Sequence, residues 1–340
     1  MLRFILSFEA VWFSATLYII MTKKRILTGL QPSGALHIGN YFGSLKPTVD
    51  MSNSSDDDVF LMVADYHALT SVRDAELLRE YTYQIVRDYL AAGIDPKRVT
   101  LFRQSDNPHH MELGWIFNCM VTVPFLMQAH SYKDKVAKGL EANAGLFTYP
   151  MLMAADIVMY DTDLVPVGED QRQHIEYTRE AVTKFNNSYG EILKEPKEVV
   201  VEGVGVVPGT DGQKMSKSYK NTIPLFGTTE EVQKAVMSIV TDSTGDRPEN
   251  VYNIHKVIYD ATGRSVSDLD KLYEDNSGKY KILKDTLVED IETIIAPMRN
   301  KRAEISDEEI KSVLSDGIER AKEVSSKTME KVRQAIGINL

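Results

Sequence analysis

Short apolar runs alternate with amphipathic stretches along the first two thirds of the chain. Runs of strand length lie at 25–30, 59–64, 99–102, 164–167 and 199–207. Most of them are uninterrupted, which is typical of parallel strands that are buried on both faces. Helical patterns separate them, as at 74–92, where apolar side chains repeat along one stripe before Gly93 ends the helix. This alternation predicts an α/β fold with a Rossmann-like doubly wound parallel sheet.

Beyond residue 228 the pattern is helical. We expect helices at 228–241, 266–276, 279–298 and 306–337, the last with Ser306 as its N-cap. The pattern thus predicts a sheet domain over 21–207, a connecting loop over 208–227 and a C-terminal all-helical domain over 228–340. A helical region at about 104–160, inserted in the sheet domain, has more apolar surface than one helix face needs, which indicates either a subunit interface or simple burial.

The first twenty residues form an apolar stretch in which only Arg3 and Glu9 are charged. A stretch of this length is long enough to span a bilayer. Glu9 interrupts it, however, no small-residue cleavage signal precedes Met21, and the chain then leads directly into the first strand. We therefore expect residues 1–20 to be an upstream extension, with Met21 as the working start and no membrane partner unless the extension is retained.

Composition limits the class of protein further. The chain has 340 residues, of which 43% are hydrophobic and 26% charged, enough for two domains with a sizeable core. Its net charge of −10 gives no support for a general DNA-binding protein, although local patches can still bind RNA. The single cysteine, Cys119, excludes an intrachain disulfide and indicates a cytoplasmic protein. His109-His110 with Glu112 is only a partial metal-ligand set, so we expect no protein-held metal.

The first candidate site is the turn at 28–40. Gly29, Pro32 and Ser33 favour a tight turn after the first strand, and a helix begins near His37. Unpaired N–H groups at such a junction favour an anion, and Gly39 lets a ligand approach the backbone. A single turn of this kind is more often an ordinary strand-to-helix connection, so the prediction needs a second element.

A loop at 208–218 supplies that second element. Its glycines allow it to move, and Lys214 and Lys217 are three residues apart with Ser216 and Ser218 beside them. Such a loop can close over a polyphosphate and place cations on charge that develops in a transition state, although a lone Lys/Ser run is usually a solvated surface. A second strand–Gly–helix junction follows at 168–171.

One carboxylate is out of place among its neighbours. Asp156 lies within an apolar helical pattern, and a carboxylate in apolar company is costly without a partner. It is either paired within the protein or reserved for a donor on a ligand.

At this point the motifs resemble a known family. His37-Ile38-Gly39-Asn40 resembles the HIGH signature, and residues 214–218 are a full KMSKS signature, in the order and separation of class I aminoacyl-tRNA synthetases. Segments 31–34, 152–156 and 168–171 followed by His174 resemble the bacterial-type tryptophanyl branch. The resemblance covers nearly all of 23–340. Asn40 departs from the broad class but is frequent in this branch, whereas Pro47 is unexpected and Lys220 stands where relatives often have Gly.

The resemblance implies ATP with its Mg²⁺, L-tryptophan and tRNA(Trp) as partners, and a homodimer. The catalytic residues it implies are His37, Lys135, Lys214, Lys217 and Ser218. Those implied for ATP are Gln31, Pro32, Ser33, Gly39, Asn40, Gly168, Glu169, Asp170, Val206 and 214–218 (Lys214, Met215, Ser216, Lys217, Ser218). Those implied for tryptophan are Gln31, His67, Tyr149, Met153, Asp156, Val165, Val167 and Gln171.

The alternatives are a tyrosyl-tRNA synthetase, another nucleotidyltransferase with these two motifs, or a non-catalytic RNA-binding paralogue. Tyrosyl enzymes resemble Tyr-x-x-x-Gln-x-x-Asp on the helix that here reads Tyr149, Met153 and Asp156. These three positions share one helix face. A thioether favours the face of an indole ring, and a carboxylate accepts from the indole N–H, which is only a donor. Plain core packing remains the simpler account of Met153.

Overall fold

The computed structural model describes residues 23–54, 56–137, 139, 142–168, 172–200, 207–241 and 247–339. The predicted upstream extension at 1–20 lies outside these residues. Among the helices that are described, none is long and apolar enough to cross a membrane.

The core of the molecule is a five-stranded sheet with the strand order β3-β2-β1-β4-β5. All neighbouring strands are parallel, which confirms the predicted doubly wound arrangement. The strands are β1 (Arg25–Leu30), β2 (Asp58–Val63), β3 (Val99–Arg103), β4 (Leu164–Val167) and β5 (Lys197–Val200). β5 begins two residues before the predicted last strand, and 201–206 lie outside the described residues. The strand order reverses beside β1, and ligands bind at such a switch point in open α/β sheets.

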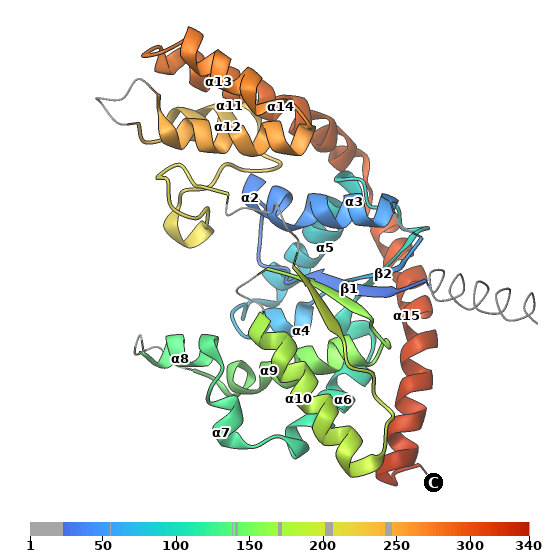
Figure 1. Ribbon diagram of the computed structural model, residues 1–340. Helices are drawn as coiled ribbons and strands as arrows, with labels where there is room; N and C mark the ends of the chain where they lie inside the picture. The colour runs from blue at the N-terminus through green and yellow to red at the C-terminus, as the bar shows by residue number, and fades with distance from the viewer. Residues whose placement is uncertain are drawn as a thin grey trace, which may run out of the picture.

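Helices surround the sheet and build a second layer above it (Figure 1). Around the sheet lie α2 (Ile38–Asn40), α3 (Lys46–Ser54), α4 (Asp65–Ala68), α5 (Ala75–Ala91), α6 (His109–Met120), α7 (Val123–Leu126), α8 (His130–Ala137), α9 (Ala144–Val158) and α10 (Arg172–Tyr189). The C-terminal helices are α11 (Thr229–Met237), α12 (Glu249–Thr262), α13 (Val266–Asp275), α14 (Tyr280–Glu304) and α15 (Asp307–Ile336).

Alternate residues of the strands enter two hydrophobic clusters. Leu61 and Val63 point into the first cluster, which α5 and helices of the C-terminal layer complete. Phe60 and Met62 point into the second cluster, with α6, α9 and α10. The sheet is therefore buried on both faces, which explains why its strands are continuous apolar runs.

The first helical segment of the described residues changes its hydrogen-bond pattern just before a proline. A π-helical turn, Tyr41–Leu45, separates α2 from α3, and Pro47 lies in the first turn of α3. A proline is tolerated in a first turn because its missing N–H has no partner there. Pro47 therefore lies just after the change from π-helical to α-helical hydrogen bonding.

A partly buried ion pair helps attach the helical layer to the sheet domain. The Arg302 guanidinium of α14 donates to the Asp88 carboxylate of α5 across 2.5 Å, and Asp88 is only 2% exposed. The same guanidinium lies 5.0 Å from the centre of the Phe226 ring, in the segment that leads into α11. One side chain therefore joins α14 to α5 and to the connection between the domains.

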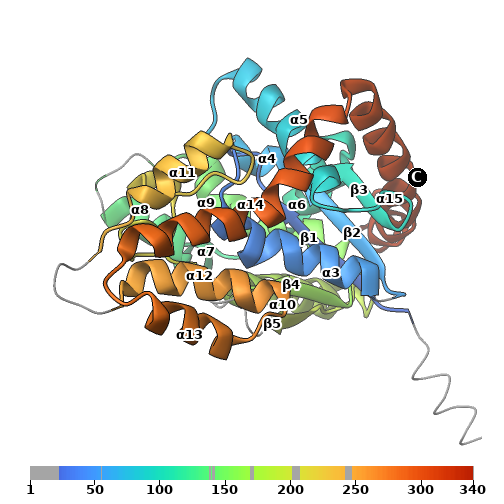
Figure 2. The same cartoon turned by 90° about the horizontal axis from the view of Figure 1, so that it is seen from above.

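The last helix leaves the helical layer and returns to the sheet. Figure 2 shows α15 beside β3, the strand at one edge of the sheet. Its first turns enter the first cluster through Ile310, and later turns enter the second through Ile318. A Cβ atom on Gly317 would lie 1.7 Å from the Leu101 carbonyl oxygen, so the helix packs on the β3 backbone itself. The boundary at residue 228 stays a prediction, but by its contacts α15 covers the sheet.

Candidate active site

The HIGH-like segment forms the N-terminus of α2. His37 is the N-cap: its Nδ1 accepts the Asn40 backbone N–H at 3.2 Å, while Asn40 Oδ1 accepts the His37 N–H at 3.1 Å. Burial, aided by the positive charge of Lys217, lowers the pKa of His37 to about 4. His37 is therefore neutral at neutral pH. Because Nδ1 accepts, the proton lies on Nε2, which is the ring nitrogen left to donate to a ligand.

The KMSKS loop is held in shape by one side chain that the sequence analysis did not single out. Asn221, 2% exposed, donates to Asp211 Oδ1 at 2.7 Å and to the Lys214 carbonyl at 3.1 Å, and accepts the Ser216 N–H at 2.8 Å. Lys220 beside it has φ +54°, in the left-handed region. That conformation favours glycine, so a lysine is strained at this position.

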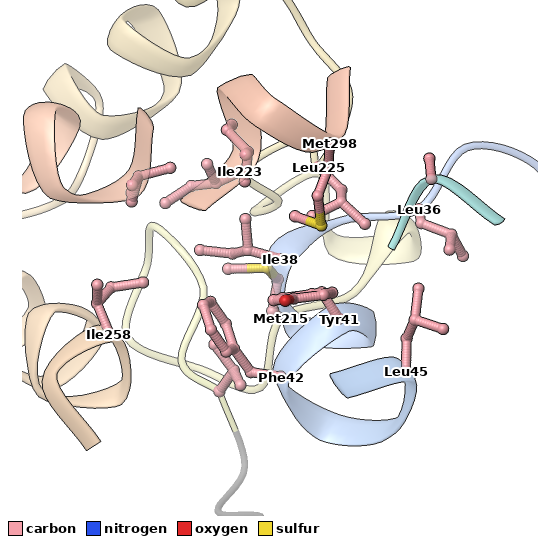
Figure 3. Close-up of a cluster of buried hydrophobic side chains, with 14 of the residues drawn as sticks. Leu36, Ile38, Tyr41, Phe42, Leu45, Met215, Ile223, Leu225, Ile258 and Met298 are labelled. Atoms are coloured by element: carbon pink, nitrogen blue, oxygen red, sulfur yellow. The ribbon is translucent and has the colours of Figure 1, made fainter. Parts of the chain in front are cut away.

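The two predicted motifs meet through the segment that follows the loop. The Ile38 N–H donates to the Ile223 carbonyl, and the Leu225 N–H donates to the Leu36 carbonyl, both at 3.0 Å. Figure 3 shows Met215 of the loop among the apolar side chains of this junction, beside Ile38. The loop is thus packed on the start of α2 through its apolar residue, which leaves its lysines on the outer side.

A lysine of the loop reaches the turn before α2. Lys217 Nζ donates to the carbonyl oxygens of Ser33 and Gly34, both at 3.0 Å. A Cβ atom on Gly39 would lie 3.3 Å from Met215 Cβ and 2.9 Å from His37 Nδ1. The structure therefore brings the turn, the neutral histidine and a loop cation to one place at the carboxyl end of β1.

The other residues predicted for ATP are distributed around that place. Gln31 and Ser33 are exposed directly after β1, Pro32 is buried, and Gly168 is exposed directly after β4. Lys214 and Ser218 are exposed on the loop. Glu169, Asp170 and Val206 lie outside the described residues, as does the side chain of Lys135.

The buried carboxylate has protein partners on every side. Asp156 of α9, 2% exposed, receives hydrogen bonds from His67 Nε2 at 2.8 Å, His110 Nδ1 at 2.7 Å, and Gln104 Nε2 at 2.8 and 3.0 Å. Burial alone raises its pKa, but the hydrogen bonds from His110 and His67 outweigh burial and lower the pKa to about 2. Asp156 is therefore an ionised acceptor inside the protein.

Of the residues predicted for the amino acid, Tyr149 and Asp156 contact His67. Its ring lies 6.2 Å from the Tyr149 ring, edge to face, and Tyr149 is in turn hydrogen-bonded to His174. Met153 lies between Tyr149 and Asp156 on α9, partly buried against the second hydrophobic cluster. Val165 and Val167 of β4 are buried in the same cluster, and Gln171 lies outside the described residues.

A groove of about 790 Å³ opens beside His67 and Tyr149. His67 and Tyr149 are the two members of the predicted tryptophan set that line it; its other lining residues come mainly from α6, α7 and the start of α9. Asp156, Met153 and the residues predicted for ATP do not line it, so we do not assign the groove to the substrates. Exposed apolar side chains at its rim include Trp115, which is 71% exposed.

Two further residues at the site were not predicted for it. Gln104 directly follows β3, and ligands bind at the carboxyl ends of the strands in open α/β sheets, so its position after a predicted strand points to it. His110 was noted only within a partial metal set. That set is broken up, because His110 faces Asp156 while Glu112 pairs with Arg333. Among the described residues, no group of three or more His, Cys, Asp or Glu could hold a metal ion.

Comparison with known proteins agrees with this geometry. Residues 21–324 match the family model described as tRNA synthetases class I (W and Y). A tryptophan–tRNA ligase from Fusobacterium nucleatum is 46% identical over 93% of this chain and 98% of its own length. One from Campylobacter jejuni is 43% identical over 92% of this chain and its full length. The crystal structure of tryptophanyl-tRNA synthetase from Campylobacter jejuni complexed with ADP and tryptophan is 42% identical, with a TM-score of 0.84 over 92% of this chain and 99% of that one.

The chain is therefore a class I aminoacyl-tRNA synthetase of the group that serves tryptophan and tyrosine. Within that group it belongs to the bacterial tryptophan–tRNA ligase family.

Proposed function

We propose that the chain joins L-tryptophan to tRNA(Trp) in two steps, with ATP as the energy source. The observation that carries the proposal is the contact of the Lys217 loop with the turn before the His37 helix start, after β1. The Asp156 cluster supports it, because His67 and Gln104 follow β2 and β3 at the same edge of the sheet. The tryptophan–tRNA ligases at 43–46% identity support it.

In the first step a tryptophan carboxylate oxygen attacks the α-phosphorus of ATP. A new O–P bond forms in line with the bond to the β-phosphate, which breaks and releases pyrophosphate. The protein forms no covalent intermediate, so it acts through positioning and charge stabilisation. Lys214, Lys217 and Ser218 of the loop face the departing pyrophosphate, Lys135 joins them, and His37 donates from Nε2. Mg²⁺, carried by ATP, neutralises phosphate charge.

The loop has to change its contacts for this step. Lys217 Nζ is bound to the carbonyl oxygens of Ser33 and Gly34, and it must exchange these acceptors for phosphate oxygens. The remaining ATP contacts that we propose are Gln31, Pro32, Ser33, Gly39, Asn40, Gly168, Glu169, Asp170, Val206, Met215 and Ser216.

The amino acid is selected at Asp156. The indole N–H is only a donor, and Asp156 is a buried, ionised acceptor. His67 is the only one of the three described donors to that carboxylate that is not completely buried, so the indole N–H takes its place at Oδ2. Tyr149, Met153, Val165, Val167, Gln171 and Gln31 form the rest of the proposed pocket.

Tyrosine is the competing amino acid. Its phenol both donates and accepts, and tyrosyl enzymes resemble a pattern with glutamine at the position of Met153. The thioether of Met153 offers an apolar, polarizable surface that suits the indole face better than a phenol hydroxyl. The proposal therefore assigns tryptophan, with tyrosine as the alternative.

The second step moves the tryptophanyl group from the adenylate to the terminal ribose of tRNA. We propose that the helices from residue 228 on bind the anticodon region and that two chains form a homodimer. The apolar rim of the groove, with Leu69, Met111, Trp115 and Val123 exposed, is the surface that we assign to the second copy. A cytoplasmic location stays a prediction from the cysteine content.

Amino-acid-dependent ATP–pyrophosphate exchange, measured with each standard amino acid in turn, tests the proposal. We expect exchange with tryptophan and little with tyrosine. Asp156→Ala is expected to lower kcat/KM for tryptophan, because it removes a buried binding group. The loss corresponds to at least about 2 kcal/mol of transition-state stabilisation.

Asp285→Ala, which removes a more exposed carboxylate on α14, serves as the matched control and keeps wild-type activity. Preferred exchange with tyrosine, or tryptophan activation that survives Asp156→Ala unchanged, would reject the amino-acid assignment.

A further inference from the structure

The Asp156 carboxylate has no acceptor capacity to spare. A carboxylate accepts about four hydrogen bonds, two on each oxygen. Oδ1 receives His110 Nδ1 and Gln104 Nε2, and Oδ2 receives His67 Nε2 and the same Gln104 amide nitrogen, all within 3.0 Å. An acceptor this saturated is held in one orientation by its donors.

The three donors differ in their surroundings. His67 is the most exposed of the three, at 6%. Gln104 and His110 are both 0% exposed. Gln104 is fixed at its other end, where its Oε1 accepts the Tyr66 N–H at 3.1 Å. His110 is fixed too, because its Nε2 lies 2.9 Å from the Tyr160 hydroxyl.

The hydrogen bonds behind His110 fix which nitrogen carries its proton. Nδ1 faces a carboxylate, which only accepts, so Nδ1 must be the donor. In a neutral ring Nε2 is then bare and accepts from the Tyr160 O–H, and the Tyr160 oxygen accepts from Asn107 Nδ2 at 3.1 Å. Burial raises the pKa of Tyr160 well above its usual range, so its hydroxyl keeps the proton that it donates.

The chain of hydrogen bonds ends on the last helix of the protein. Asn107 Nδ2 also donates to Ser325 Oγ of α15 at 2.9 Å. One consistent order of protons thus satisfies Asp156, His110, Tyr160 and Asn107 with a neutral imidazole. A hydrogen-bonded order of this kind makes each group depend on its neighbour.

We propose that His110, with its tautomer set by Tyr160, is a positioning residue that holds Asp156 as the acceptor for the indole N–H of tryptophan. The inference rests on the proposed function, because it needs Asp156 to receive that N–H. His110 is completely buried behind Asp156 and acts through that carboxylate. Its effect is therefore specific for substrates that carry the N–H.

Two substrates separate this role from a merely structural one. The first is tryptophan, and the second is its benzothiophene analogue, in which sulfur replaces the N–H. We expect His110→Leu to lower kcat/KM for tryptophan about tenfold or more, mainly through KM, while the value for the analogue changes less than about twofold. Discrimination between the two substrates therefore collapses. His110→Asn, whose amide nitrogen replaces Nδ1–H, is expected to restore most of it.

Tyr160→Phe tests the tautomer with almost no change in volume, and it decides the matter if His110→Leu does not fold. We expect it to lower kcat/KM for tryptophan about threefold or more and to leave the analogue unchanged. Tyr273→Phe, which removes a buried hydroxyl hydrogen-bonded to His255 in the helical layer, is the matched control and keeps wild-type discrimination.

Equal losses for both substrates in the His110 and Tyr160 variants, or wild-type discrimination in either, would overturn the proposal. A failure of the proposed function looks different: the wild-type protein would not activate tryptophan, or Asp156→Asn would keep its discrimination against the analogue.

Discussion

A single methyl group on Gly317 should separate the last helix from the sheet. The Cβ atom of Gly317→Ala would lie 1.7 Å from the Leu101 carbonyl oxygen and 2.6 Å from the Leu101 carbonyl carbon. Ordinary C···O contacts begin at about 3.3 Å, so α15 must withdraw by more than about 1 Å. The obstacle is strand backbone, which has no rotamer to change.

The free-energy cost can be estimated from two opposing terms. Alanine is better than glycine inside a helix by about 1 kcal/mol. Overpacking of a core costs about 1–3 kcal/mol, and the upper end applies because the backbone of β3 blocks the methyl group. The withdrawal also lengthens the hydrogen bonds from the Arg320 guanidinium to the carbonyl oxygens of Pro96 and Val99, now 2.7 and 2.9 Å. We expect a net loss of about 2–3 kcal/mol in the free energy of unfolding.

Urea unfolding followed by circular dichroism measures this loss. The matched control is Gly114→Ala, also in the middle of a helix, where the nearest atom to the new Cβ is Leu152 Cα at an ordinary 3.5 Å. There the helix propensity alone acts, so the control is expected to be neutral or stabilised by up to about 1 kcal/mol. If Gly317→Ala proves as stable as Gly114→Ala, α15 does not pack on β3 as described.

Two further expectations concern the loop and the proposed second copy. Lys217→Met should lower kcat of tryptophan-dependent exchange about 100-fold while KM for tryptophan changes less than about threefold, because a cation on the departing pyrophosphate acts in the transition state. Lys234→Met on α11 is the control. Equal effects of Lys217→Met on kcat and KM would contradict this role of the lysine. Trp115→Lys places a charge in the apolar rim of the groove and should convert a dimer to a monomer in sedimentation equilibrium. Val240→Lys, at another exposed position, should leave the dimer intact. A monomeric wild-type protein, or a dimer that Trp115→Lys does not affect, would refute the proposed interface.

The parts of the fold that the sequence predicted are those with strong periodicity. Four of the five strands and the long helices α5, α14 and α15 lie within a few residues of the predicted ranges, and Ser306 is the N-cap of α15. The predicted helices omitted α12, Glu249–Thr262. Its residues are rich in asparagine, tyrosine and β-branched side chains of weak helix propensity. Burial of its apolar face in the first cluster overrides that preference.

The site was predictable as far as it depends on the ends of strands and on local motifs. The sequence paired residues 28–40 with the KMSKS loop, and the structure joins them through Lys217. The sequence left open whether Asp156 is paired within the protein or reserved for a ligand. In the structure it accepts hydrogen bonds from three side chains. Those partners come from three separate elements. No local pattern shows such an arrangement, because it depends on how α4, α6 and the end of β3 converge.

The return of α15 to the sheet sets an order of events during synthesis. A ribosome delivers β3 more than two hundred residues before the helix that covers it. Until the 30 residues of α15 have emerged, the outer edge of β3 is open to pairing with other chains, and Asn107 lacks its partner Ser325. The nascent sheet domain therefore needs protection for most of translation. A chain that stops short of α15 leaves the edge of the sheet uncovered. It also lacks the last member of the hydrogen-bond chain behind Asp156.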